Sequence, residues 1–127
     1  MYEIIIEDHF TAIHYLKLYD GSWEKPHGHN WKVAVTAQAE NLDSIGVVMD
    51  FEMLKPALKE ILAGFNCTSF NEHPRFKGTG VNSSTENIAR LIYDELVKKV
   101  KSKTARITKI TVWETADACA SFIENAP

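Results

Sequence analysis

The chain has 127 residues, of which 45% are hydrophobic and 24% charged, as is typical of a single globular domain spanning residues 1–127. Its formal net charge of −3 gives no reason to expect nucleic acid or an anionic membrane as a partner. The apolar runs are too short to cross a bilayer, and the N-terminus lacks the layout of a signal peptide. Because Cys67 and Cys119 are the only cysteines, we expect a cytoplasmic protein without a disulfide framework.

Two strands are predicted in the first third of the chain. Over residues 2–16 the even positions are mostly apolar and lead to His14, and Asp8 interrupts this apolar face and indicates a bulge. Residues 17–26 have the composition of a loop. A second strand is predicted over residues 27–39, with its odd positions on the buried face.

Two helices are predicted from capping residues and apolar spacing. Asp50 is a suitable N-cap for a helix that Gly64 ends. Pro56 lies inside this pattern and indicates a kink or a later start. The second helix is expected to begin near Ser83, where Ser83-x-x-Glu86 resembles a capping box.

The remaining segments complete the topology. Residues 65–82 are predicted to be irregular, residues 105–114 to form a third strand and residues 118–124 a short last strand. The order is therefore β-β-α-α-β-β. This order predicts an α+β fold, in which an antiparallel sheet carries two helices on one face.

The histidines are the most informative residues of the sequence. His27 and His29 are two positions apart on a predicted strand, so their imidazoles project from the same face. His14 lies on the apolar face of the first strand, whereas His9 has the opposite parity and is expected to be exposed. Three nitrogen ligands with an open fourth position are typical of a catalytic zinc site. Taken alone, each histidine would equally suit a hydrogen-bonded core or surface position.

Five short motifs occur in order over nearly the whole chain. They are Phe10-x-Ala12-x-His14, His27-Gly28-His29-Asn30, Asp50-Phe51-x-x-Leu54-Lys55, Asn82-x-Ser84-Thr85-Glu86-Asn87-x-Ala89 and Trp113-Glu114-Thr115. In this combination the chain resembles the family of 6-pyruvoyl-tetrahydropterin synthase and 6-carboxytetrahydropterin synthase. The resemblance implies the tunnelling fold, in which three subunits close an oligomeric barrel and two trimers stack into a homohexamer, with the sites between subunits.

The resemblance also assigns roles to individual residues. His14, His27 and His29 match the three zinc ligands of the family, so Zn²⁺ is the expected cofactor. Such a metal acts as a Lewis acid on an oxygen of the substrate side chain. The implied substrate is a small-molecule pterin, dihydroneopterin or its triphosphate, and the implied activity is that of a lyase.

Three further residues match positions that bind the pterin ring. Glu114 matches the carboxylate that anchors the ring through two hydrogen bonds, although a glutamate near a strand end equally suits solvent exposure. Ser84 and Thr85 match positions that touch the pterin, although hydroxyls at a helix start are explained by capping alone.

The chain departs from the family pattern where a catalytic cysteine is expected. The position four residues before His27 is occupied by Trp23, and the next residue is Glu24. The resemblance includes a subgroup in which a glutamate from this loop replaces the cysteine and the enzyme cleaves dihydroneopterin to a hydroxymethylpterin. Glu24 is therefore the candidate general base, with an exposed loop carboxylate as the alternative interpretation.

A second departure affects the Asp-His pair that shuttles protons in the family. Asn66-Cys67 occupies the matching positions. Cys67 is then either a relocated catalytic thiol or a structural cysteine, and His73 a few residues later is a candidate imidazole. Three functions remain open: a zinc-dependent lyase, a catalytically altered paralogue that binds metal and pterin without turnover, and a structural assembly module with a vestigial site.

Overall fold

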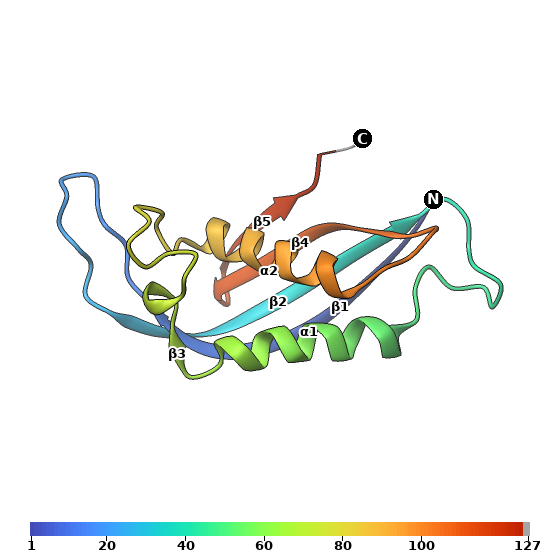
Figure 1. Ribbon diagram of the computed structural model, residues 1–127, viewed down its shortest axis with the longest axis horizontal. Coiled ribbons are helices and arrows are strands. Elements are labelled where there is room, and N and C mark those ends of the chain that lie inside the picture. The colour runs from blue at the N-terminus through green and yellow to red at the C-terminus, as the bar shows by residue number, and fades with distance from the viewer. Residues whose placement is uncertain (126–127) are drawn as a thin grey trace.

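The computed structural model describes residues 1–125 of the chain. Its elements follow in the order β1 (Tyr2–His14), β2 (His27–Ala39), α1 (Phe51–Phe65), β3 (Thr68–Ser69), the 3₁₀ turn η1 (Phe70–Glu72), α2 (Thr85–Lys99), β4 (Arg106–Thr115) and β5 (Ala118–Ile123). Both helices cover the same face of the sheet (Figure 1), as the sequence predicts. Among the described residues, no helix is both long and apolar enough to cross a membrane.

The sheet contains five strands in the order β3-β1-β2-β4-β5. The four long strands pair antiparallel, as predicted, but β3 pairs parallel with residues 12–13 of β1. The prediction of a purely antiparallel sheet and of an irregular segment over 65–82 is therefore wrong in this detail. A two-residue strand leaves no periodic pattern in the sequence, because one alternation is indistinguishable from a loop.

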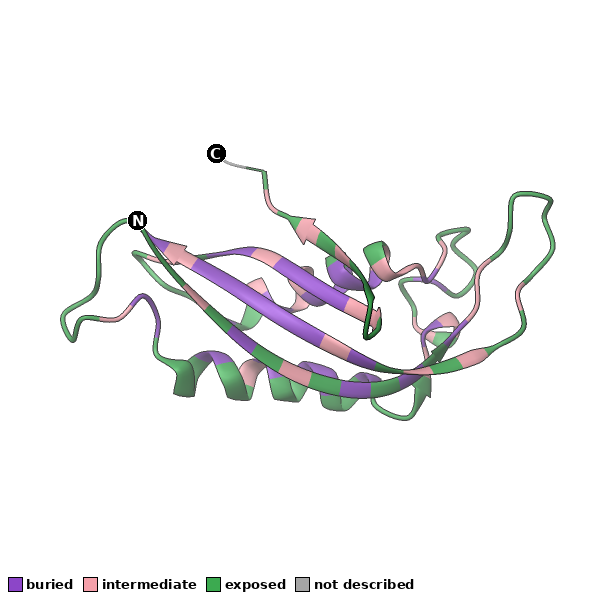
Figure 2. Ribbon diagram, turned by 180° about the vertical axis from the view of Figure 1, so that it is seen from behind, coloured by how far each residue is buried: buried purple, intermediate pink, exposed green. Residues whose placement is uncertain are grey.

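The core fills the space between the helices and one face of the sheet. From β2 the side chains of Trp31, Val33 and Val35 are fully buried, and they meet Leu58 of α1 and Leu91 of α2 within one apolar cluster. The opposite face carries no helix (Figure 2), and buried and exposed residues alternate along β1. This alternation places every second side chain of a strand on the helix-covered face, and His14, His27 and His29 share that face.

The predicted bulge at Asp8 is wrong, because β1 pairs with β2 without interruption from Tyr2 to His14. Asp8 accepts a hydrogen bond from the His9 N–H and is only half-buried, so the regular strand accommodates it. The register shifts instead between Thr36 and Ala37. A second shift, in the pairing of β4 with β5, falls at the position of Glu114.

The first helix departs from the prediction at its end. Asp50 is the N-cap, accepting from the Glu52 N–H, and α1 continues through the exposed Pro56 without a later start. Gly64 lies inside α1 and does not end it. The turn after the helix is made by Cys67, which adopts φ 60° and donates its N–H to Thr11 at 2.6 Å.

The second helix begins one residue later than the predicted capping box places it. Ser84 is the N-cap and accepts a hydrogen bond from the Asn87 N–H at 3.2 Å. Ser83 is instead fully buried and directs its carbonyl toward His14. Consecutive serines hide this shift, because either one satisfies the sequence rule for a cap.

Candidate metal centre

The pairing of β1 with β2 brings the three predicted histidines together. In the antiparallel register His14 faces His27, and His29 lies opposite Ala12. The rings are in contact, with centroids 4.6 Å apart for His14 and His27 and 4.9 Å apart for His27 and His29. The strand spacing that predicts a shared face therefore predicts the cluster correctly.

A fourth group, Glu114 of β4, completes the cluster. Its Oε1 lies 2.6 Å from Nε2 of His14, 3.4 Å from that of His29 and 4.0 Å from that of His27. All four of these atoms lie within 4.8 Å of one another. The register shift between β4 and β5 falls at this glutamate, which remains 31% exposed in its side chain. Glu114 is thus within reach both of a metal ion and of a ligand from solvent.

Backbone carbonyls fix the orientation of two imidazoles. Nδ1 of His14 lies 2.7 Å from the Ser83 carbonyl, and Nδ1 of His27 lies 2.9 Å from the Lys25 carbonyl. Because a carbonyl oxygen only accepts, each of these Nδ1 atoms carries a proton and donates it, which turns Nε2 toward the cluster. A partner of this kind on the outer nitrogen is typical of metal-binding histidines.

The surroundings favour a neutral ring at His29. Burial lowers the pKa of His29, and the other two histidines lower it further, while the carboxylates of Glu114 and Glu24 oppose this effect. Behind the cluster, Trp31 is fully buried. Its ring lies edge-on to His14, at 4.8 Å between centroids. Burial therefore favours the neutral form of His29, the form in which an imidazole binds a metal.

These donors fit a zinc ion. Among the described residues, Nε2 of His14 and Nε2 of His29 are buried atoms without a hydrogen-bond partner, and Glu114 Oε1 makes no hydrogen bond to either despite its proximity. Three lone pairs and a carboxylate facing one another repel, unless a cation lies between them. Three imidazole nitrogens, with a carboxylate or a solvent molecule as the fourth ligand, suit Zn²⁺.

Glu24 lies close enough to the cluster to influence it. The Glu24 carboxylate accepts a hydrogen bond from the Leu16 N–H at 2.8 Å, and its own N–H donates to the Leu16 carbonyl at 2.9 Å. The residue is half-buried, and its charge acts on His29. The loop from 15 to 26 therefore holds this carboxylate in place beside the histidines.

The other two catalytic candidates lie outside the four-residue cluster. Cys67 is exposed and makes the turn after α1. His73 packs against the rings of Phe65 and Phe76, and its Nδ1 accepts from the Arg75 N–H at 3.0 Å. Burial lowers the pKa of His73, and its charged neighbours are Glu95 and Arg75 and not the groups of the cluster. Its local contacts are those of a structural histidine.

The predicted pterin-binding hydroxyls stand at the start of α2. The hydroxyl of Ser84 is engaged in capping, and Thr85 is the first helical residue. Their neighbour Ser83 reaches His14 through its carbonyl, which sequence reasoning missed. A serine that acts through its carbonyl leaves no signal in the sequence, because every residue carries one.

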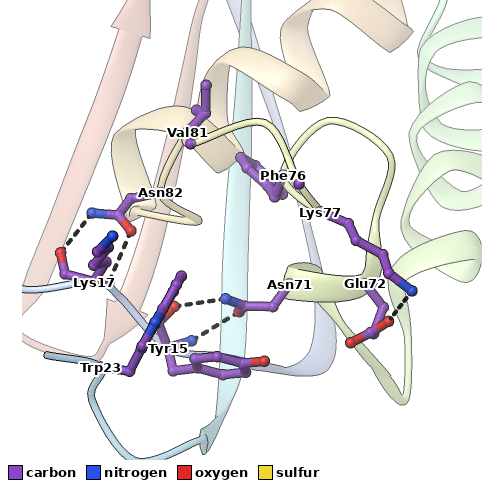
Figure 3. A pocket seen from close by; sticks show the side chains of 11 residues that line it. Tyr15, Lys17, Trp23, Asn71, Glu72, Phe76, Lys77, Val81 and Asn82 are labelled. Carbon is purple, nitrogen blue, oxygen red and sulfur yellow. Dashed lines mark hydrogen bonds and ion pairs between the residues drawn. The ribbon is translucent and has the colours of Figure 1, made fainter. Parts of the chain in front are cut away.

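A pocket of about 480 Å³ lies between the segment after β1 and the segment before α2 (Figure 3). Tyr15, Trp23 and Asn82 line it, and each directly precedes or follows a residue of the site: His14, Glu24 and Ser83. The rings of Tyr15 and Trp23 meet edge to face, at 5.6 Å between centroids. The bulky Trp23 thus forms part of a pocket wall where the resemblance implies a cysteine.

Comparison with known proteins places the chain in a family. The model of the 6-pyruvoyl tetrahydropterin synthase family matches residues 3–125. A putative 6-carboxy-5,6,7,8-tetrahydropterin synthase of Archaeoglobus fulgidus is 37% identical over 98 residues, covering 77% of this chain and 76% of the relative. The human 6-pyruvoyl tetrahydrobiopterin synthase is 36% identical over 104 residues, covering 79% of this chain and 68% of the human protein. The 6-carboxy-5,6,7,8-tetrahydropterin synthase of Bacillus subtilis is 29% identical over 98 residues, and the match spans only 65% of its length.

Solved structures share the fold. The 6-pyruvoyl tetrahydropterin synthase of Caenorhabditis elegans superimposes with a TM-score of 0.80 at 23% identity, over 98% of both chains. That of Plasmodium vivax gives 0.82 at 18% identity, also over 98% of both chains. Together with the match over residues 3–125, these likenesses show that the chain belongs to the 6-pyruvoyl tetrahydropterin synthase family.

Proposed function

We propose that this protein is a zinc-dependent lyase that acts on the side chain of a reduced pterin, dihydroneopterin or its triphosphate. The observation that carries the proposal is the convergence of three imidazole Nε2 atoms and the Glu114 carboxylate within 4.8 Å. The relatives, named as 6-carboxytetrahydropterin and 6-pyruvoyl tetrahydrobiopterin synthases, support a pterin as the substrate class.

His14, His27 and His29 would hold the zinc ion through Nε2. A zinc ion bound there would supply Lewis acidity to an oxygen of the substrate side chain. Burial favours the neutral form of His29, and the carbonyls of Ser83 and Lys25 orient the rings of His14 and His27. Preformed ligands reduce the cost of ordering the site when metal binds.

Glu24 would act as the general base. One oxygen of its carboxylate is held by the Leu16 N–H, so the other is free to accept a proton from a substrate hydroxyl. Removal of that proton would let the hydroxyl oxygen form a carbonyl as the adjacent carbon–carbon bond breaks. The outer two carbons would leave as an aldehyde, and the carbon attached to the ring would take up a proton to give a hydroxymethylpterin. Support comes from the Plasmodium vivax synthase, for which variants of a glutamate described as a catalytic residue have been solved.

Glu114 would anchor the pterin ring. A carboxylate accepts two parallel hydrogen bonds from the 2-amino group and N3–H of a pterin. Its position beside the three Nε2 atoms would bring the ring and its side chain next to the metal. Ser84 and Thr85, at the start of α2, are proposed as further contacts with the ring.

We further propose that subunits join edge to edge into a trimer or hexamer. The β5 edge is exposed along the sheet, and β3 covers only residues 12–13 of the outer β1 edge. Unpaired edges of long strands are sites for pairing with another chain. Light scattering on the purified protein would test this, and a monomer would contradict it.

The test of the function is a product assay. Metal-loaded protein is incubated with dihydroneopterin and, separately, with its triphosphate, and the products are identified by mass spectrometry. We expect a pterin with a shortened or rearranged side chain, and none from the chelated protein. Binding of either pterin without product would contradict the lyase and favour a paralogue that binds metal and pterin without turnover. The Asn66-Cys67 pair is the feature that favours this second candidate.

A further inference from the structure

Two asparagine side chains pair with the backbone of the segment that directly follows β1 (Figure 3). Asn71 accepts a hydrogen bond from the Tyr15 N–H at 3.0 Å and donates to the Tyr15 carbonyl at 2.8 Å. Asn82 binds Lys17 in the same way, at 2.9 Å and 3.0 Å. A carboxamide presents a donor and an acceptor side by side, so each asparagine takes the place of one residue of a neighbouring strand.

Ser83 lies beside these two contacts and is 1% exposed. Its hydroxyl lies 3.0 Å from Asn71 Oδ1 and 3.3 Å from the Tyr15 carbonyl. On its N-terminal side, the Asn82 carbonyl accepts from the Asn87 side chain at 2.9 Å. Ser83 is therefore held both through its hydroxyl and through the peptide that precedes it.

We propose that Asn71 and Asn82 are positioning residues of the metal centre. They hold Ser83 so that its carbonyl accepts from Nδ1 of His14, at 2.7 Å. This contact fixes the imidazole ring and its tautomer, and thereby aims the Nε2 lone pair at the cluster. The effect on metal affinity rests on the proposed metal site, but the effect on the tautomer does not.

The same segment holds the candidate base on its other edge. Leu16, between Tyr15 and Lys17, exchanges two hydrogen bonds with Glu24. In an extended chain the backbone N–H and C=O groups of one residue point to one edge, and those of the next residue point to the opposite edge. The two asparagines on one edge therefore also set where Glu24 lies on the other.

The experiment measures the metal centre and not turnover. Asn71→Ala and Asn82→Ala are compared with the parent by chelator competition for Zn²⁺ and by the absorption spectrum of the Co²⁺-substituted protein. We expect a metal affinity lower by about 10–100-fold and altered Co²⁺ bands, as is typical when a partner beyond the ligands is lost. Asn71→Asp keeps the acceptors for Tyr15 and Ser83, so its affinity should lie between those of the parent and Asn71→Ala.

A tautomer measurement complements the affinity. Long-range ¹H–¹⁵N correlation spectra of the metal-free protein should show His14 with its proton on Nδ1 in the parent. In Asn71→Ala a mixture of tautomers is expected. This readout remains informative if the parent binds no metal, a result that would contradict the proposed function but not the positioning role.

Asn66→Ala is the matched control. Asn66 also binds the outer edge of β1, accepting from the Thr11 N–H at 2.9 Å, but its recorded hydrogen bonds do not involve Ser83. It should lose comparable stability and keep the metal affinity within about twofold, since only partners of the ligands tune the metal.

The proposal is overturned if Asn71→Ala keeps the parent's affinity, cobalt spectrum and His14 tautomer. It is also overturned if Asn66→Ala weakens metal binding as much as Asn71→Ala does. Should Asn71→Ala fail to fold, Ser83→Ala replaces it, since this variant retains the carbonyl and loses only the hydroxyl. A smaller loss of affinity in the same direction supports the proposal, and an unchanged affinity overturns it.

Discussion

The paired ends of β1 and β2 and the segment over residues 66–83 lie side by side, yet they use their polar side chains differently. On the strands, His14, His27 and His29 leave Nε2 free and turned toward one another. In the segment, Asn71 and Asn82 engage both amide atoms with the backbone. The difference indicates that strand register creates the cluster and that the segment orients it.

The largest effect is expected for Glu24, which belongs to the loop that connects the two strands. Glu24→Gln removes the base and keeps an acceptor oxygen for the Leu16 N–H. Turnover of dihydroneopterin should fall by about 10²–10⁴-fold, the usual contribution of a general base, with zinc content unchanged. Steady-state kinetics and metal analysis of the same preparation measure both quantities. Undiminished turnover would show that the proton acceptor lies elsewhere, and Cys67→Ser would be assayed next.

Removal of a strand histidine tests the cluster itself. His27→Ala should lower zinc affinity by more than about 100-fold, because it removes a ligand and not merely its partner. His9→Ala is the control, since His9 lies on the same strand pair but is exposed on the other face. Chelator competition gives both affinities, and an equal loss in the two variants would refute the assignment of ligands.

Glu114 has two possible roles in the site, as the anchor of the pterin ring and as a fourth metal ligand. If Glu114 anchors the pterin, its replacement by glutamine should weaken pterin binding by about 10–100-fold, the value of a hydrogen bond to a charged group. Zinc affinity should then remain unchanged. If Glu114 is a fourth metal ligand, the same replacement should lower zinc affinity instead. Calorimetric titration of Glu114→Gln with zinc, and then with a pterin, separates the two. We expect the first result.

Much of the fold and the cluster followed from periodicity. The alternation along residues 2–16 and 27–39 predicts three histidines on one face, and the structure confirms this face, with β1 ending at His14. Because one loop connects the two strands and they pair antiparallel, their register brings the three imidazole rings together. The resemblance assigns Glu114 only to the substrate, since the sequence does not reveal how close this carboxylate comes to the imidazoles.

The connections over residues 66–83 could not be predicted in the same way. The strand β3 and the cap at Ser84 rest on one or two hydrogen bonds, and the turn at Cys67 uses a conformation that is uncommon for a side chain other than glycine. Gly64 is predicted to end the first helix, but the helix extends to Phe65 because its ring is buried in the core. Tertiary packing here overrides the local signal.

The smallest effect concerns His73, which lies in the segment over residues 66–83 and makes only local contacts. Burial lowers its pKa below the ordinary value of 6.5, so the unfolded chain takes up the proton first as the pH falls. The free energy of unfolding should therefore decrease as the pH is lowered through 6.5 toward the folded pKa. His73→Asn keeps an acceptor for the Arg75 N–H but does not ionise, so its free energy of unfolding should decrease less steeply.

Urea denaturation of both metal-free proteins between about pH 7 and pH 5 measures the slopes, and His29 contributes equally to each. Parallel curves would mean that His73 titrates as freely in the folded protein as in the unfolded chain. In that case it would be available for proton transfer, and a loss of turnover in His73→Asn would follow in place of the unchanged turnover expected here.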